Sequence, residues 1–252
     1  MLVTVLLLAG AQSCTWISVA NQTLDKSFLL EINEGITTAG DDSHWILTGH
    51  AAMLKVDLTL DIVKRNDFPI PQHMMIVGGY NHIGDPAFHD GLIYAPIEQT
   101  AFQNGSVFVY NADSLELEDF FFVNQRHFPW IAIADSVMWS SEFKNVDVLF
   151  GYDLKGNRKS LVKLSRTLQD VQGGAFWTGL LYLTLNPPSS AVVSVNLTTG
   201  VVQDVIPTIE PELEGIAFID LSSQGLGQMH LLNGHSWEGP SLASTLFHFS
   251  CE

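Results

Sequence analysis

The chain has 252 residues, of which 46% are hydrophobic and 15% are charged, so it holds enough apolar material for one large core and is not a disordered chain. Its 27 acidic and 11 basic residues give a formal net charge of −16 at pH 7. That balance argues against binding to nucleic acid or to anionic membrane surfaces, because both require clustered Lys and Arg. No stretch reaches the roughly 18 to 20 apolar residues of a membrane span.

Residues 1–11 have the pattern of a secretory signal peptide. Residues 2–8 are continuously apolar, and Ala9-Gly10-Ala11 resembles the small-residue cleavage site that follows such a run. A second cleavage candidate, Ser18-Val19-Ala20, would extend the signal to residue 20. The alternative interpretation is a buried first strand. We expect a signal peptide and therefore a secreted, extracellular protein.

The two cysteines, Cys14 and Cys251, lie near opposite ends of the sequence. If cleavage follows Ala11, both remain and can form a disulfide; if it follows Ala20, Cys251 is left alone. Three acceptor sequences for N-glycosylation are compatible with secretion and a glycoprotein. They begin at Asn21, Asn104 and Asn196.

An orphan strand-like segment, Ser27 to Ile32, precedes the strongest signal in the sequence, which is an internal repeat. A short apolar segment recurs, with Thr37, Ala87, Ala132, Ala175 and Ala217 at equivalent positions. The intervals between these positions are 50, 45, 43 and 42 residues. Such a period fits one four-stranded blade of a β-propeller.

Each of the first four copies is followed by two apolar runs with turn residues between them, the pattern of a β-hairpin. The fifth copy is followed by one run only, Thr245 to Phe249. If the segment Ser27 to Ile32 pairs with this last blade, the ring closes without a bare sheet edge. The sequence thus predicts an all-β fold for residues 27–252, a single five-bladed β-propeller closed by an N-terminal strand. The same closure would bring Cys14 near Cys251.

The innermost strands of a propeller line a central channel, and the loops that lead into them form one face. Five residues before the repeated alanines, His82 and His127 occupy equivalent positions on this face. Either could act as a catalytic general base near neutral pH if a carboxylate orients it. The alternative is a hydrogen-bonded structural histidine.

Carboxylates also gather at the predicted channel face. Glu34 and Glu214 begin the same Glu-Gly-Ile tripeptide in different copies, and Asp85 lies one position further along. Together with the amide oxygen of Gln172 they could form an oxygen-rich site of the kind that Ca²⁺ prefers. We therefore predict Glu34, Asp85 and Glu214 as metal ligands, with capping of strand ends as the alternative.

Aromatic side chains near this ring offer surfaces on which a ligand could stack. Trp130 and Trp177 are predicted to contact a ligand together with Gln172. The alternative for both tryptophans is packing between blades.

Two stretches resemble repeats of a known superfamily: Glu214-Gly215-Ile216-Ala217-Phe218 and the Asp-Gly-Leu-Ile-Tyr stretch at 90–94. They are similar to extracellular propellers of the calcium-dependent lactonase, paraoxonase and strictosidine-synthase-like type. That resemblance implies that Glu34 and Glu214 ligate a central cation. The blade count and size are also similar to plant-type glutaminyl cyclotransferases and olfactomedin-like domains.

Two functions remain open on these grounds. One is a secreted propeller that binds a small molecule or a protein through its acidic channel face, with a bound Ca²⁺ as a further element. The other is a metal-dependent hydrolase of the lactonase or esterase type, or a cyclotransferase, in which the cation polarises a carbonyl and His82 or His127 moves a proton.

Overall fold

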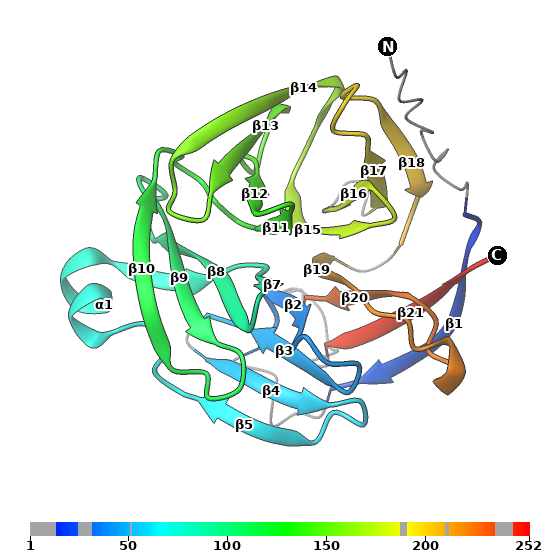
Figure 1. The fold of residues 1–252 in the computed structure, drawn as a ribbon, viewed down its shortest axis with the longest axis horizontal. Helices are drawn as coiled ribbons and strands as arrows, with labels where there is room; N and C mark the ends of the chain where they lie inside the picture. The colour runs from blue at the N-terminus through cyan, green and yellow to red at the C-terminus, as the bar shows by residue number, and fades with distance from the viewer. Residues whose placement is uncertain (1–13, 25–31, 51, 187–190, 210–211, 235–243) are drawn as a thin grey trace, which may run out of the picture.

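The computed structural model describes residues 14–24, 32–50, 52–186, 191–209, 212–234 and 244–252. Five small antiparallel sheets stand around a central axis and form a five-bladed β-propeller (Figure 1), which confirms the predicted fold class. None of the helices in the described part of the chain has the length and apolarity that a membrane crossing requires.

The first three blades follow one another in chain order, each running outward from the axis. Blade 1 contains β2 (Gly35–Thr38), β3 (His44–Thr48), β4 (Met53–Asp57) and β5 (Ile62–Asn66). A short helix, α1 (Gln72–Gly78), leads to blade 2, which contains β6 (Tyr80–Ile83), β7 (Ala87–His89), β8 (Leu92–Gln99), β9 (Gly105–Asn111) and β10 (Leu117–Val123). Blade 3 contains β11 (Ala132–Ala134), β12 (Val137–Ser140), β13 (Val146–Asp153) and β14 (Arg158–Leu168).

The last two blades complete the ring, and the final one is built from both ends of the chain. Blade 4 contains β15 (Val171–Trp177), β16 (Leu180–Leu185), β17 (Ala191–Val195) and β18 (Val202–Ile206). Blade 5 contains β19 (Leu213–Phe218), β20 (Met229–Asn233), β21 (Thr245–Cys251) and, as its outer strand, β1 (Trp16–Thr23). A 3₁₀ turn, η2 (Ser222–Gln224), lies between β19 and β20.

The closure differs from the prediction in the segment that provides it. Strand β1 pairs antiparallel with β21 from Trp16 opposite Cys251 to Thr23 opposite Thr245. The predicted closing segment, 27–32, lies outside the described residues except for Ile32, which is buried. The predicted signal peptide, residues 1–11, lies outside them as well. Cleavage after Ala20, the alternative end of that signal, would divide β1.

The predicted disulfide is confirmed, and it locks this closure. Cys14 and Cys251 are bonded with their Cα atoms 5.1 Å apart, a normal separation for a disulfide. The bond lies two residues before β1 and at the last residue of β21, so it holds together the two strands that close the ring.

The turns after the third strands form as the sequence predicts. The last residue of this strand, or the residue just after it, is Asp or Asn, and its side-chain oxygen accepts a hydrogen bond from a backbone N–H two residues later. The four acceptors are Asp57, Asn111, Asp153 and Asn196, at distances of 2.9 to 3.0 Å.

The apolar core lies between the blades, and each cluster joins two neighbours. Trp45 of blade 1 packs in one cluster with Leu232 of blade 5, which joins the first and last blades. Four further clusters join blades 1 and 2, 2 and 3, 3 and 4, and 4 and 5. Neighbouring blades thus cover each other's faces, whereas outer strands such as β5 and β14 stay largely exposed.

Candidate functional site

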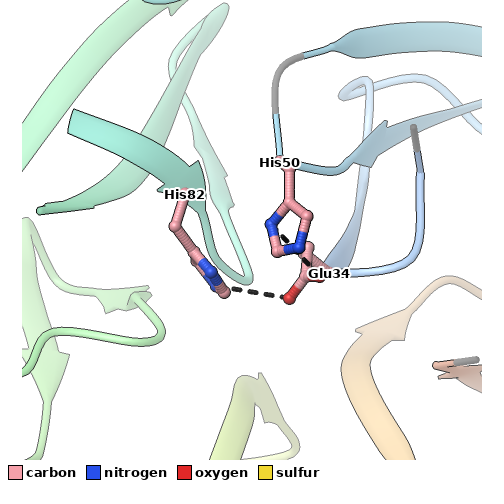
Figure 2. Close-up of side chains that lie close together, drawn as sticks. All are labelled: Glu34, His50 and His82. Carbon is pink, nitrogen blue, oxygen red and sulfur yellow. Dashed lines mark ion pairs between the residues drawn. The ribbon is translucent and has the colours of Figure 1, made fainter. Parts of the chain in front are cut away.

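Two sets of strand ends meet at one end of the channel, which we call the channel face. The first residues of the inner strands lie there, and so do the residues that follow the second strands, because the two strands are antiparallel. Glu34 precedes β2, His50 follows β3, and His82 lies on β6 of the next blade. Both imidazole rings face the Glu34 carboxylate in Figure 2.

The Glu34 carboxylate contacts both histidines. Oε2 of Glu34 lies 3.2 Å from Nε2 of His82, and Oε1 lies 3.6 Å from Nδ1 of His50. The centroids of the two imidazole rings are 5.1 Å apart. Only 9% of the Glu34 side chain is exposed, so this cluster joins blades 1 and 2 around a nearly buried carboxylate.

The electrostatics of this cluster favour its charged form. Burial raises the pKa of Glu34, but the hydrogen bond with His82 and the positive charges of His82 and His50 outweigh burial, and the pKa lies below its ordinary value. Burial lowers the pKa of His82, but the Glu34 hydrogen bond and the charges of Glu34 and Glu98 raise it above its ordinary value. Both shifts favour the charged forms, so the contact between Glu34 and His82 stabilises an ion pair of the two side chains.

A second pair of the same kind lies beside the first. Glu98 stands opposite His82 across the strands β6 and β8, and its Oε2 lies 3.1 Å from Nε2 of His127. The Glu98 side chain is 1% exposed, and its other oxygen accepts a hydrogen bond from the backbone N–H of Phe128. Acids and histidines thus alternate across three blades in the order Glu34, His82, Glu98 and His127.

Aromatic rings surround His127. The ring centroid of Phe102 lies 4.3 Å from that of His127, and the centroid of Phe143 lies 5.1 Å from it. Phe102 also borders two surface hollows of about 370 and 450 Å³, the first beside His50 and His82 and the second beside His127, Glu142 and Lys144. The pairs of acid and histidine therefore open toward a surface with room for a small ligand.

Gln172 and Glu214 contact each other at the start of the inner strands of blades 4 and 5. Nε2 of Gln172 donates a hydrogen bond of 2.6 Å to Oε2 of Glu214. Burial and the negative charges of Glu34, Glu212 and Asp85 raise the pKa of Glu214 well above its ordinary value. The pKa values of Glu214 and Glu34 are thus shifted in opposite directions, although both residues begin the same tripeptide.

Asp85 lies at the centre of the ring and connects all five blades. Its carboxylate accepts hydrogen bonds from the backbone N–H groups of Ile36, Gly174 and Ile216, at 2.9, 3.0 and 3.4 Å. Its own backbone N–H donates to the carbonyl of Pro129, and its carbonyl accepts from the N–H of Ile131, both at 2.9 Å.

This position changes the interpretation of Asp85. Burial raises the pKa of its carboxyl well above the ordinary value, although the three backbone donors act in the opposite direction. Both oxygens already accept backbone hydrogen bonds, so the structure gives Asp85 a place in the framework and does not bring it to the Glu34 cluster. A Ca²⁺ held by Glu34 and Glu214 stays a prediction.

Neither predicted tryptophan lies at the channel face. Trp130 is fully buried, its Nε1 donates to Oγ of Ser141 at 3.2 Å, and its ring fills the space above Gly174. Trp177 ends β15, at the opposite end of that strand from Gln172, and stacks on Phe218 with ring centroids 5.4 Å apart. For both tryptophans the packing interpretation fits the structure, and the aromatic rings beside the polar groups are Phe102 and Phe143.

Sequence reasoning missed His50, Glu98 and Phe102 for a single reason. It compared only residues that lead into the inner strands, whereas these three lie at or after the ends of the second strands β3 and β8. The signal was available, because the far end of a second strand in an antiparallel pair returns to the same face.

Comparison with known proteins identifies the class of fold. No protein-family model matches the chain, and no curated protein sequence does either. Among solved structures it is similar to the glutaminyl cyclase of Myxococcus xanthus, with a TM-score of 0.69 and 14% identity over 94% of this chain and 97% of that one. The chain has the fold of a five-bladed propeller of this kind.

Two further solved structures are similar to parts of the chain. A Bacteroides caccae protein of unknown function matches with a TM-score of 0.52 and 14% identity over 82% of this chain and 73% of that one. The WD40 domain of Neurospora crassa Pan2 matches with a TM-score of 0.43 and 11% identity over 85% of this chain and 62% of that one. At these identities the likeness concerns the fold alone.

Proposed function

We propose that the channel face binds a small substrate with an amino group and catalyses acyl transfer within it, by general acid–base catalysis. The observation that carries this proposal is a pair of opposite pKa shifts on one face, since burial and neighbouring acids raise the pKa of Glu214 whereas the contact with His82 lowers that of Glu34. Two titratable groups whose pKa values are driven apart by their surroundings are typical of an acid and a base in one site.

The residues suit the proton transfers of such a reaction. The amine nitrogen forms a bond to a carbonyl carbon, the bond from that carbon to its leaving nitrogen breaks, and ammonia or an amine departs. His127, oriented by Glu98, would take the proton from the attacking amine. Glu214, whose raised pKa favours its protonated form, would give a proton to the leaving nitrogen. The excess of carboxylates on the face would attract a cationic substrate.

Cyclisation of an N-terminal glutamine is the first reaction to test, because the glutaminyl cyclase from Myxococcus xanthus has the same fold over nearly its whole length. Its α-amine would attack the side-chain amide carbon and release ammonia. Hydrolysis of a lactone or an ester by the same residues is a broader alternative, in which water replaces the amine as nucleophile.

The test uses purified protein and a short peptide with an N-terminal glutamine, with the N-acetylated peptide as a control that cannot cyclise. Release of ammonia and the matching loss of mass are measured for the wild type, His127→Asn, Glu214→Gln and Glu116→Gln. Glu116 is exposed in the turn between β9 and β10, at the other end of the channel. We expect wild-type turnover, a fall in kcat of about 10² to 10⁴-fold in the first two variants, and no change in Glu116→Gln.

A second candidate is binding without turnover. It is favoured by hydrogen bonds between polar side chains of the channel face. Gln172 donates to Glu214, and Asn186 donates to Glu212 at 3.0 Å, as in a preformed recognition surface. If the protein binds the peptide, releases no ammonia from it and hydrolyses neither lactones nor esters, the result would support this candidate and contradict the catalytic one. Lack of both binding and turnover would contradict both.

We also propose that the protein is secreted and glycosylated. A disulfide is typical of an oxidising compartment, and the side chains of Asn21 and Asn104 are exposed. Expression in secreting eukaryotic cells should yield protein in the medium whose mass falls on treatment with an N-glycosidase. Retention of the chain in the cytosol, with both thiols reduced, would contradict secretion.

A further inference from the structure

Beyond the proposed acyl transfer, we propose that Glu34, His50 and His82 form a binding site for one divalent transition-metal ion, for which Zn²⁺ is the appropriate probe. Each residue offers one ligand atom, and these atoms all lie within 4.8 Å of one another. The three side chains converge from blades 1 and 2 on one point (Figure 2). The proposal stands whether or not the acyl-transfer reaction is found.

The donor atoms select the kind of metal. Two imidazole nitrogens and one carboxylate oxygen suit Zn²⁺ and other borderline ions, whereas Ca²⁺ prefers six to eight oxygens. Two histidines and a glutamate, with a water at the fourth position, are a known ligand set of catalytic Zn²⁺. The sequence indicates only oxygen donors for a metal, because His50 follows the second strand β3 and does not belong to the repeated positions before the inner strands.

An independent observation on His50 points to a missing partner. Its Nδ1 atom is buried yet makes no hydrogen bond in the structure. It faces Oε1 of Glu34 at 3.6 Å, which is too long for a hydrogen bond. Whenever Nδ1 carries no proton, its lone pair and those of the carboxylate oxygen repel each other unless a cation lies between them, and a metal ion would bind both atoms.

The backbone holds the three residues in fixed relation. The N–H of Glu34 donates to the carbonyl of Thr48 at 3.0 Å, which fixes Glu34 beside the chain that leads to His50. Oγ1 of Thr48 donates to the carbonyl of Gly84 at 3.0 Å, two residues beyond His82. Ligands held on strand ends by such bonds are positioned before the metal arrives, which favours affinity.

The site also has an open side. The hollow of about 370 Å³ is lined by His50, Asn81, His82, Gln99, Thr100 and Phe102. It gives a metal ion a route from solvent and leaves room for a water or a ligand oxygen at the fourth position. A bound ion there could also polarise a carbonyl group, which is a Lewis-acid role separate from the proton transfers proposed above.

The experiment is a titration of metal-free protein with Zn²⁺ by calorimetry, and with Co²⁺ by visible absorption. We expect one ion per chain in the wild type and the visible bands of Co²⁺ with nitrogen ligands. In His50→Gln and Glu34→Gln the affinity should fall by more than the 10- to 100-fold that loss of an outer-shell partner costs. The His50 side chain is 46% exposed, so its substitution should leave the fold intact, and circular dichroism with EDTA present checks this.

His44→Gln is the matched control. His44 pairs with Asp41 at 3.0 Å at the other end of the channel, where it has the same pairing of imidazole and carboxylate but no second histidine. The affinity of the His44→Gln variant for Zn²⁺ should equal that of the wild type. Equal binding in all variants would mean adventitious surface binding, and tight binding of Ca²⁺ in place of Zn²⁺ would mean an oxygen site; either result would overturn the proposal.

Discussion

The carboxylate of Asp85 occupies the space that a side chain at position 215 would need. A Cβ atom added to Gly215 would lie 2.6 Å from Oδ1 of Asp85, and one added to Gly173 would lie 2.7 Å from Oδ2. Gly35 is equally close, with its added Cβ 2.5 Å from Cα of Asp85. One acid can thus lie at the centre of five blades because three of the equivalent positions carry no side chain.

Gly215→Ala should destabilise the protein by about 1 to 3 kcal/mol, the usual cost of inserting a methyl group where no space exists. Asp85→Ala should cost about 3 kcal/mol or more, because three buried N–H groups lose their acceptor at about 1 to 3 kcal/mol each. The measurement is the free energy of unfolding in urea.

The double variant tests whether these two residues act together. With Asp85 truncated, the methyl group at position 215 has room. The double variant should therefore lose about 0.5 to 3 kcal/mol less stability than the sum of the losses in the two single variants. Strict additivity would show that the crowding at Gly215 comes from the backbone of Ile36 rather than from Asp85. Gly91→Ala is the control, since a Cβ there meets no atom within 4 Å and only its positive φ of 79° adds a cost.

The ring of inner-strand positions was predictable from sequence because the repeat keeps its register there. Glu34, Asp85 and Glu214 lie at or near the first residues of inner strands, the positions that the repeat marks, but their protonation and bonding depend on neighbours from other blades. Whether a carboxylate accepts backbone N–H groups, as Asp85 does, depends on glycines more than 80 residues away in sequence, such as Gly173. The one-dimensional pattern does not contain that information.

The closing strand was harder to predict for a different reason. Most residues of β1 are exposed or half-buried, because it is the outermost strand of its blade. Such a strand carries little apolar periodicity, and Ser18-Val19-Ala20 resembled a cleavage site instead. The apolar segment at 27–32 therefore carries the stronger sequence signal for a closing strand.

Loss of the Cys14–Cys251 disulfide should destabilise the protein strongly. The two cysteines are separated by 237 residues, and the loss of loop entropy in the unfolded chain gives about 5 kcal/mol for so long a loop. Cys14→Ser, Cys251→Ser and the double variant should be equally destabilised, as measured by urea unfolding. A double variant that is much less stable than either single variant would mean that the thiols contribute through packing.

Acidification should weaken blade 5 through His230 and His248, which face each other with Nδ1 atoms 2.7 Å apart. Burial lowers the pKa of His230 to about 3, with a further contribution from His248, and burial lowers the pKa of His248 to about 4. The unfolded chain binds protons at both positions below a pH of about 6.5, whereas the folded chain does so only near pH 4 and 3. The stabilisation is therefore complete above pH 6.5 and is lost as the pH falls toward 3.

The thermal midpoint between pH 7 and pH 4 measures this effect. Its decline should be shallower in His230→Gln than in the wild type, after allowance for the lower stability of the variant at pH 7. His89→Gln is the control, because His89 is only half-buried at the end of β7 and contacts no second histidine among the described residues. An unchanged slope in His230→Gln would assign the acid sensitivity to the carboxylates.

Phe102 should contribute to ligand binding much more than to stability. It adopts a positive φ of 47°, which is unusual for a bulky residue, and it lines both hollows, with its ring centroid 4.3 Å from that of His127. Phe102 is 40% exposed and belongs to none of the apolar core clusters that the described residues form, so Phe102→Ala should change the free energy of unfolding in urea by less than about 1 kcal/mol. For a ligand at the channel face, the loss of aromatic contact should weaken binding by about tenfold, equivalent to about 1.4 kcal/mol.

Phe122→Ala, on the exposed strand β10, is the matched control and should leave binding unchanged. If both substitutions weaken binding equally, or neither does, the ligand does not bind beside Phe102.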